Sequence, residues 1–172
     1  MKNVTGTTTY CRSASPLGAM LLVAHDDALA GVYFDDQKYL PAIESGWRED
    51  ATTPVLRATR RQLAEYFAGA RTRFDVPLAT RGTAFQRAVW KAIAAVPWGR
   101  TAAYADVATR AGHPGSARAA GAATGRNPWS IVVPCHRIVA TSGALTGYAG
   151  GLSRKEALLA LEGRDARTAI AA

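Results

Sequence analysis

A cysteine followed directly by a histidine and an arginine is the feature of this sequence that points most clearly to chemistry, in the run Pro134-Cys135-His136-Arg137. A free thiol has a pKa of about 8.5, so a neighbouring base or positive charge is needed to raise its thiolate fraction at neutral pH. His136 is a candidate base, and Arg137 supplies a positive charge. Adjacent side chains of a strand point to opposite faces, so a turn after Pro134 or a bridging water would have to connect thiol and imidazole.

A carboxylate that orients the histidine would complete such a site. Only four acidic residues follow position 80, and any of them could serve: Asp106, Glu156, Glu162 and Asp165. The alternative is a buried, inert cysteine beside a surface histidine, and the spacing alone leaves both interpretations open. Cys11, the only other cysteine, is predicted to be a buried strand residue. Two cysteines without a CxxC pair predict neither a disulfide framework nor a metal site.

The charge distribution indicates a polyanionic partner. The chain has 172 residues and a net charge of +8. Residues 1–80 carry nine basic and nine acidic side chains, whereas residues 81–172 carry twelve and four. A basic half favours nucleic acid, against the alternative of a general solubility charge. The apolar run at 17–24 is interpreted as a buried strand, and no run is long enough to span a bilayer, so a cytoplasmic protein with no membrane contact is expected.

The first half, residues 1–80, is predicted to be a small sheet with one helix that gives structural support. Ser-Pro and Asp-Asp breaks that suit hairpin turns separate three predicted strands, at 7–13, 18–25 and 29–34, and a further strand is expected at 74–78. A helix should begin at Thr53, with Pro54 in its first position, and run to about Ala68.

The second half, residues 81–165, is predicted to be mostly helical, with a tail at 166–172. The pattern favours helices at 85–95, 101–111 and 116–124, the last capped by Ser116 after a glycine-containing turn typical of a helix-turn-helix. That third helix is built of small residues with one long cation, Arg118, so it should approach a backbone or a DNA groove closely. A buried strand is expected at 131–133 and a last helix from a Ser153–Glu156 capping box.

Several stretches together resemble the DNA O6-alkylguanine alkyltransferases, also called methylated-DNA–protein-cysteine methyltransferases. The matching stretches are TAFQRAVWKAIAAVPWGRTAAYADVA (83–108), GHPGSARAAGAA (112–123), Asn127-Pro128, IVVPCHRIV (131–139) and TGYAGGLSRKEALLALEG (146–163). The resemblance implies an α/β (α+β) fold, with an N-terminal ribonuclease-H-like domain and a C-terminal winged-helix or helix-turn-helix-like domain. It also implies repair of O6-alkylguanine, and possibly O4-alkylthymine, in double-stranded DNA by irreversible, single-turnover alkyl transfer.

The resemblance implies a role for each matched residue. Cys135 matches the alkyl acceptor, and His136 matches a base that acts on the thiol through a water. Glu162 matches the carboxylate that orients the histidine. Asn127 matches a hinge asparagine, and Tyr104 matches a phenol that helps to rotate the nucleotide and supplies a proton near the departing guanine.

The remaining matches concern DNA and the base pocket. Arg118 matches a cation that fills the gap left by a base flipped through the minor groove, with Ser116, Ala117 and Ala119 as DNA-contacting neighbours on the same helix. The base pocket is matched by Tyr148, Ala149 and Gly150, with the backbone around Ile138 as its floor. No cofactor, metal or protein partner is implied, and a monomer is expected. The alternatives are a non-catalytic sensor of alkylated bases with a helix-turn-helix, and a Cys–His hydrolase.

Overall fold

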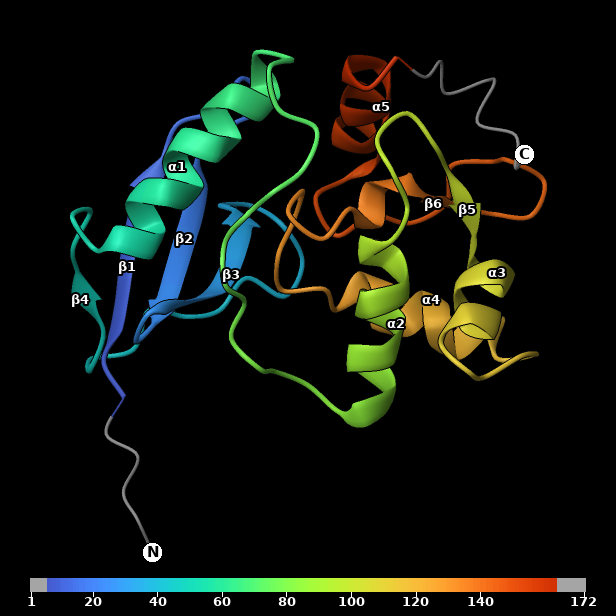
Figure 1. The fold of residues 1–172 in the computed structure, drawn as a ribbon, viewed down its shortest axis with the longest axis horizontal. Coiled ribbons are helices and arrows are strands. Elements are labelled where there is room, and N and C mark those ends of the chain that lie inside the picture. Colours follow the sequence, from blue (N-terminus) through green and yellow to red (C-terminus); the bar gives the residue numbers. More distant parts are fainter. Residues whose placement is uncertain (1–5, 164–172) are drawn as a thin grey trace, which may run out of the picture.

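The structure, a computed structural model, describes residues 6–163 as a sheet-containing N-terminal half beside a mostly helical C-terminal half (Figure 1). Asp165 and the predicted tail at 166–172 lie outside the described residues. The mixed architecture expected from the sequence is therefore confirmed.

The N-terminal half is a four-stranded sheet with one covering helix. Its strands are β1 (Thr8–Ser13), β2 (Met20–His25), β3 (Ala28–Phe34) and β4 (Arg48–Glu49), in the order β3-β2-β1-β4. Strands β1, β2 and β3 are antiparallel neighbours, and the short β4 pairs parallel to β1. Helix α1 (Pro54–Phe67) lies across the sheet and buries Leu56, Leu63 and Tyr66 against it. The predicted helix and first three strands are thus present.

The predicted strand at 74–78 is wrong. Within this segment only Leu78 pairs with the sheet, through an isolated bridge to Leu29. Leu29 N donates to Pro77 O and Ala79 N donates to Leu29 O, so the chain touches the edge of β3 at one point and moves on to the second half.

The C-terminal half consists of short helices around a very small sheet. Its elements are α2 (Ala84–Ala94), β5 (Ala102–Ala103), α3 (Tyr104–Arg110), α4 (Ala117–Gly125), the 3-10 turn η1 (Cys135–Arg137), β6 (Ile138–Val139) and α5 (Leu152–Leu161). Strands β5 and β6 pair parallel. Helices α3 and α4 are joined by a turn in which Gly112 and Gly115 have positive φ, which agrees with the expected helix-turn-helix pattern.

Four local predictions in this half need correction. Residues 131–133 form turns rather than a strand, with Ile131 at φ 71°. Helix α5 begins at Leu152 after Gly151, so Ser153 lies inside the first turn and makes no capping box. The Ser116 side chain makes no capping hydrogen bond. In addition, residues 102–103 belong to β5, so the helix predicted over 101–111 begins only at Tyr104.

A continuous hydrophobic core joins the two halves. Trp129 donates its indole N–H to Leu29 O over 2.8 Å and stacks edge-on against Trp90 of α2, with ring centroids 5.5 Å apart. The backbone of Val32 exchanges hydrogen bonds with Pro128 and Ser130. The edge of β3 is therefore bonded to the segment that leads into Cys135.

Candidate active site

Cys135 lies in the one-turn 3-10 helix η1, which follows Pro134. Cys135 N donates to Val133 O over 2.8 Å, and Arg137 N donates to Pro134 O over 3.0 Å. Successive side chains of a 3-10 turn are about 120° apart, because it has three residues per turn. A turn after Pro134, one of the two connections between Cys135 and His136 expected from the sequence, is therefore present. Both side chains are buried, with 5% and 0% of their surface exposed.

Asn127 holds this turn and contacts the thiol directly. Its side-chain amide donates to Cys135 Sγ over 3.1 Å and to Val133 O over 2.8 Å. Its Oδ1 accepts from Trp129 N over 3.0 Å. These contacts join the segment that follows α4 to the turn that holds Cys135.

Glu162 is the carboxylate that meets His136. Its Oε1 lies 2.8 Å from His136 Nε2, and Arg137 donates to both carboxylate oxygens, from Nε over 2.8 Å and from Nη2 over 2.9 Å. The other described acids lie elsewhere, because Asp106 accepts from Ala103 N at the start of α3 and Glu156 is exposed on α5. Glu162 follows the last residue of α5, so that helix determines its place.

Tyr66 of α1 joins the same cluster, although the sequence analysis did not identify it. Its phenol donates to Glu162 Oε1 over 2.7 Å and lies 3.5 Å from His136 Nε2. In the sequence Tyr66 falls on the apolar face of a helix, which predicts only a core residue. Neither its type nor its spacing could have indicated that its hydroxyl meets residues 70 and 96 positions away.

The protonation states follow from burial and these hydrogen bonds. Burial alone would raise the pKa of Glu162, but the hydrogen bonds and charges of His136 and Arg137 lower it to about 2. Burial lowers the pKa of His136 and raises that of Tyr66, whose phenol also faces the Glu162 charge. At neutral pH the cluster therefore holds a carboxylate, a neutral imidazole, a phenol and a guanidinium.

The neutral imidazole has one nitrogen free to act as a base. Ionised Glu162 can only accept, so Nε2 of His136 carries the proton and Nδ1 keeps its lone pair. Nδ1 is buried and has no hydrogen-bond partner among residues 6–163. The arrangement matches the base-and-orienting-carboxylate pattern of nucleophilic sites.

Lys155 is a second buried residue whose charge acts on the Cys135 thiol and that was not predicted from the sequence. It is fully buried on α5, and its ammonium donates to the carbonyls of Ile138, Thr146 and Gly147. Burial lowers its pKa to about 8. Burial raises the pKa of the Cys135 thiol, whereas the Asn127 hydrogen bond and the Lys155 charge lower it.

A cavity of about 210 Å³ opens onto Cys135. Its size is below the roughly 300 Å³ of small-molecule pockets in general, and suits one planar ring system. Its walls come from both halves of the chain: Lys38, Tyr39, Tyr104, Gly121, Ala122, Thr124, Gly125, Gly147, Tyr148 and Ala149. Lys38 and Tyr39 were not expected in the site, and the guanidinium of Arg126 stacks 3.7 Å from the Tyr39 ring centroid.

Two predicted pocket residues do not line this cavity. The side chain of Ile138 is fully buried in the core, and its carbonyl accepts from Lys155. Gly150 accepts from Arg154 Nη1 through its carbonyl oxygen. Tyr148 and Ala149 do line the cavity, so two of the four predicted pocket residues form part of its wall.

The exposed face of α4 lies next to the cavity. A shallow depression shares Tyr104 and Gly121 with the cavity and is also lined by Ala117 and Arg118. The Tyr104 phenol donates to Thr146 O over 2.8 Å. Arg118 and Ala119 are exposed, whereas Ser116 and Ala117 are partly buried. Small side chains on this face leave the helix backbone accessible to a large partner.

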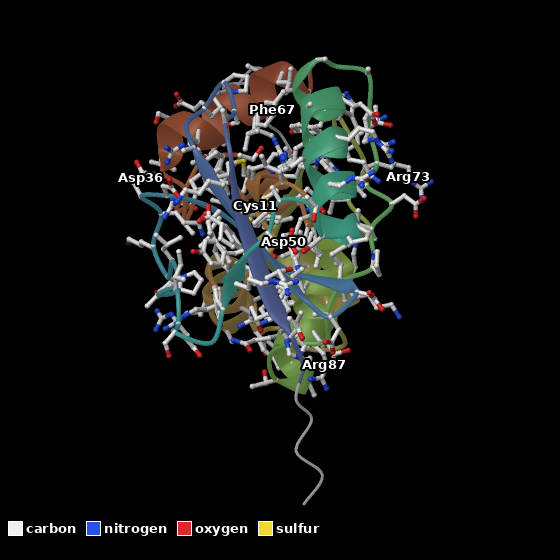
Figure 2. The ribbon with its side chains drawn as sticks, turned by 90° about the vertical axis from the view of Figure 1, so that its left-hand side faces the viewer. Cys11, Asp36, Asp50, Phe67, Arg73 and Arg87 are labelled. Carbon is white, nitrogen blue, oxygen red and sulfur yellow. The ribbon has the colours of Figure 1, made fainter. Side chains whose placement is uncertain are left out.

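Cys11 lies apart from this site. It is a buried residue of β1, 2% exposed, and burial raises its pKa. Seen from the side of β1 and β4, the helical half lies behind the sheet (Figure 2). The prediction that Cys11 is a strand residue is confirmed.

The family models that match the chain cover nearly all described residues. The 6-O-methylguanine DNA methyltransferase ribonuclease-like domain matches residues 7–80, and the DNA binding domain of the same name matches residues 84–164. Across residues 6–163, no helix combines the length and apolar character needed to cross a membrane.

Similar whole proteins carry a common name. The chain is 46% identical to the methylated-DNA–protein-cysteine methyltransferase of Mycolicibacterium paratuberculosis over 91% of this chain and 93% of the relative. It is 44% identical to that of Methanosarcina acetivorans over 90% and 97%. Among solved structures, Mycobacterium tuberculosis OGT in complex with DNA superimposes with a TM-score of 0.84 at 45% identity, covering 90% of this chain and 93% of that one.

Proposed function

This chain belongs to the methylated-DNA–protein-cysteine methyltransferase family, and we propose that it repairs DNA by taking the alkyl group of O6-alkylguanine onto its own Cys135. The observation that carries the proposal is the thiol at a cavity of about 210 Å³, beside a neutral histidine oriented by an ionised carboxylate. A cavity for one base with a nucleophile in its wall suits a reaction on a single nucleobase.

The chemical step is a single displacement on the alkyl carbon. The thiol proton of Cys135 passes through a water to His136 Nδ1, and Glu162 stabilises the imidazolium that forms. The sulfur then forms a bond to the carbon while the bond from that carbon to O6 breaks. The electron pair stays on the guanine, which takes a proton from the Tyr104 phenol, and the proton held by His136 then returns through water to the Tyr104 phenolate. The thioether product is inert, so each chain accepts one alkyl group.

The base must leave the duplex to reach Cys135. A methyl group inside stacked DNA is inaccessible, and flipping the base out costs a few kcal/mol. The exposed small residues of α4 allow close approach through the minor groove, and Arg118, exposed at the neighbouring depression, fills the gap in the stack. The basic C-terminal half supplies phosphate attraction. The protein acts as a monomer in the cytoplasm.

The test is the intact mass after mixing with a duplex that contains one O6-methylguanine. We expect a gain of one methyl per chain, located by peptide mapping on the peptide with Cys135. Cys135→Ala should bind the duplex but gain no mass. An unchanged mass of the unsubstituted protein, with the duplex still bound, would make the chain a sensor of alkylated bases instead.

A further inference from the structure

We propose that Tyr66 is a positioning residue for the His136–Glu162 pair, so that the N-terminal half takes part in the chemistry of Cys135. This inference rests on the alkyl-transfer function proposed above. It assigns a chemical role to a half of the chain whose sequence indicates only structural support. Tyr66 acts through Glu162 and touches neither the thiol of Cys135 nor the cavity that would hold the guanine.

The Tyr66 ring is held in a rigid aromatic cage. Phe67, Phe74 and Trp98 surround it with ring centroids 5.4, 5.7 and 5.3 Å away. The contacts with Phe67 and Trp98 are edge-on, at 82° and 75°. Such geometry is favourable for aromatic pairs and restricts the ring to one orientation. The hydroxyl of Tyr66 is therefore held pointing toward Glu162.

The carboxylate oxygen that Tyr66 reaches is the one that orients the histidine. Oε1 of Glu162 accepts from Tyr66, from His136 Nε2 and from Arg137 Nη2, over 2.7, 2.8 and 2.9 Å. Every donor added to this oxygen withdraws electron density that the imidazole would otherwise receive. Tyr66 thus fixes the carboxylate in place and weakens its pull on the His136 proton.

The charged and titratable groups around His136 make the effect measurable. The imidazole of His136 faces Glu162 at the end of α5, Tyr66 on α1 and Arg137 in its own turn. Cys135 precedes it in the chain, and the charge of Lys155 on α5 also acts on it. Burial keeps the pKa of the Tyr66 phenol above its usual range, so it stays a donor throughout the working pH range. Loss of that donor leaves Glu162 more basic and raises the proton affinity of His136.

The first experiment compares Tyr66→Phe with Tyr33→Phe. The first variant keeps the aromatic ring in its cage and deletes only the hydroxyl. Tyr33 is the matched control, because it is also a buried tyrosine but lies on β3 in the separate small core of Leu21, Val23 and Ala30. Single-turnover methyl transfer from an O6-methylguanine duplex is measured between pH 5 and 9, together with duplex binding and thermal melting.

We expect Tyr66→Phe to transfer methyl about tenfold more slowly at pH 7, with the acid limb of its rate profile moved upward by about half a pH unit. Tyr33→Phe should match the unsubstituted protein in both. A slower reaction with an unmoved acid limb would mean that Tyr66 only supports the fold, and overturn the inference. An unsubstituted protein that transfers no methyl would instead refute the proposed function.

A second substitution covers the case in which Tyr66→Phe does not fold. With 3-fluorotyrosine at position 66 the ring and hydroxyl remain, and the more acidic phenol donates more strongly. The acid limb should then move to lower pH, opposite to the phenylalanine variant. An unchanged limb in the fluorinated protein would equally overturn the inference.

Discussion

Replacement of Glu162 by glutamine tests the electrostatic design of the site quantitatively. The carboxylate is buried and pairs with Arg137 and His136. The difference between its ordinary pKa of 4.5 and its native pKa of about 2 is equivalent to about 3 kcal/mol of stability at neutral pH. Glu162→Gln removes this stabilisation, because it leaves the buried Arg137 guanidinium without a charged partner. The whole loss of unfolding free energy is expected to be about 3 to 5 kcal/mol.

The sign of the pH dependence follows from the lowered pKa. The unfolded chain binds the proton more tightly than the native protein does. The stabilisation is therefore present above a pH of about 4.5 and is lost as the pH falls towards 2. By pH 3 about 2 kcal/mol of it should be gone. The glutamine side chain has no such dependence.

Urea unfolding at pH 7 and pH 3 provides the measurement. Other carboxylates titrate in both proteins, so the informative quantity is the difference in unfolding free energy between the protein and its Glu162→Gln variant. His136 also titrates in this range, so both proteins carry His136→Gln, and in that background the difference should shrink as the pH falls from 7 to 3. The control is Glu156→Gln on the exposed face of α5, which should change stability by less than about 0.5 kcal/mol at both values. A Glu162→Gln difference that is the same at both pH values would refute the reasoning.

Three further predictions concern the thiol, the charge beside it and the DNA surface. Asn127→Ala should lower the free energy of unfolding by about 2 to 4 kcal/mol, because it deletes buried hydrogen bonds to the Cys135 thiol and to three backbone groups. Urea titration checks this, and a loss below about 1 kcal/mol would contradict it. Because burial lowers the pKa of Lys155 to about 8, its positive charge disappears above that pH, and the methyl-transfer rate should decline there. Lys155→Met should react more slowly at pH 7 and lack this decline; a decline that persists in its pH–rate profile would refute the assignment. Arg118→Ala should slow transfer from an O6-methylguanine duplex at least about tenfold and leave transfer from the free base unchanged, which single-turnover mass measurements can separate. Equal losses on both substrates would place Arg118 in the chemical step instead.

The strands and longer helices could be predicted because their patterns are local. Strand β1 has threonines and a tyrosine typical of strands, β2 and β3 are apolar runs bounded by turn breaks, and α1 and α2 have one apolar face each. The failures occur where an element is too short to show a period. Strands β5 and β6 contain two residues each and exist only because they pair with each other. The segment at 131–133 is apolar enough for a strand, but it turns because its neighbours bond to the edge of β3.

The sequence by itself determined which groups were available: a thiol next to an imidazole and a guanidinium, one small-residue helix with a single long cation, and a basic half. These follow from residue types and short spacings. Residue types and spacing left the carboxylate partner of His136 open, and only the family resemblance indicated Glu162. The tertiary structure shows that Glu162 meets His136, and it alone decided that a phenol from α1 shares the same oxygen and that a buried lysine lies near the thiol. The physical reason is that such contacts join residues far apart in the chain, whose meeting is determined by packing of the common core. A tyrosine on the apolar face of a helix, or a lysine in a helix of mixed character, has no local signal that distinguishes it from its neighbours.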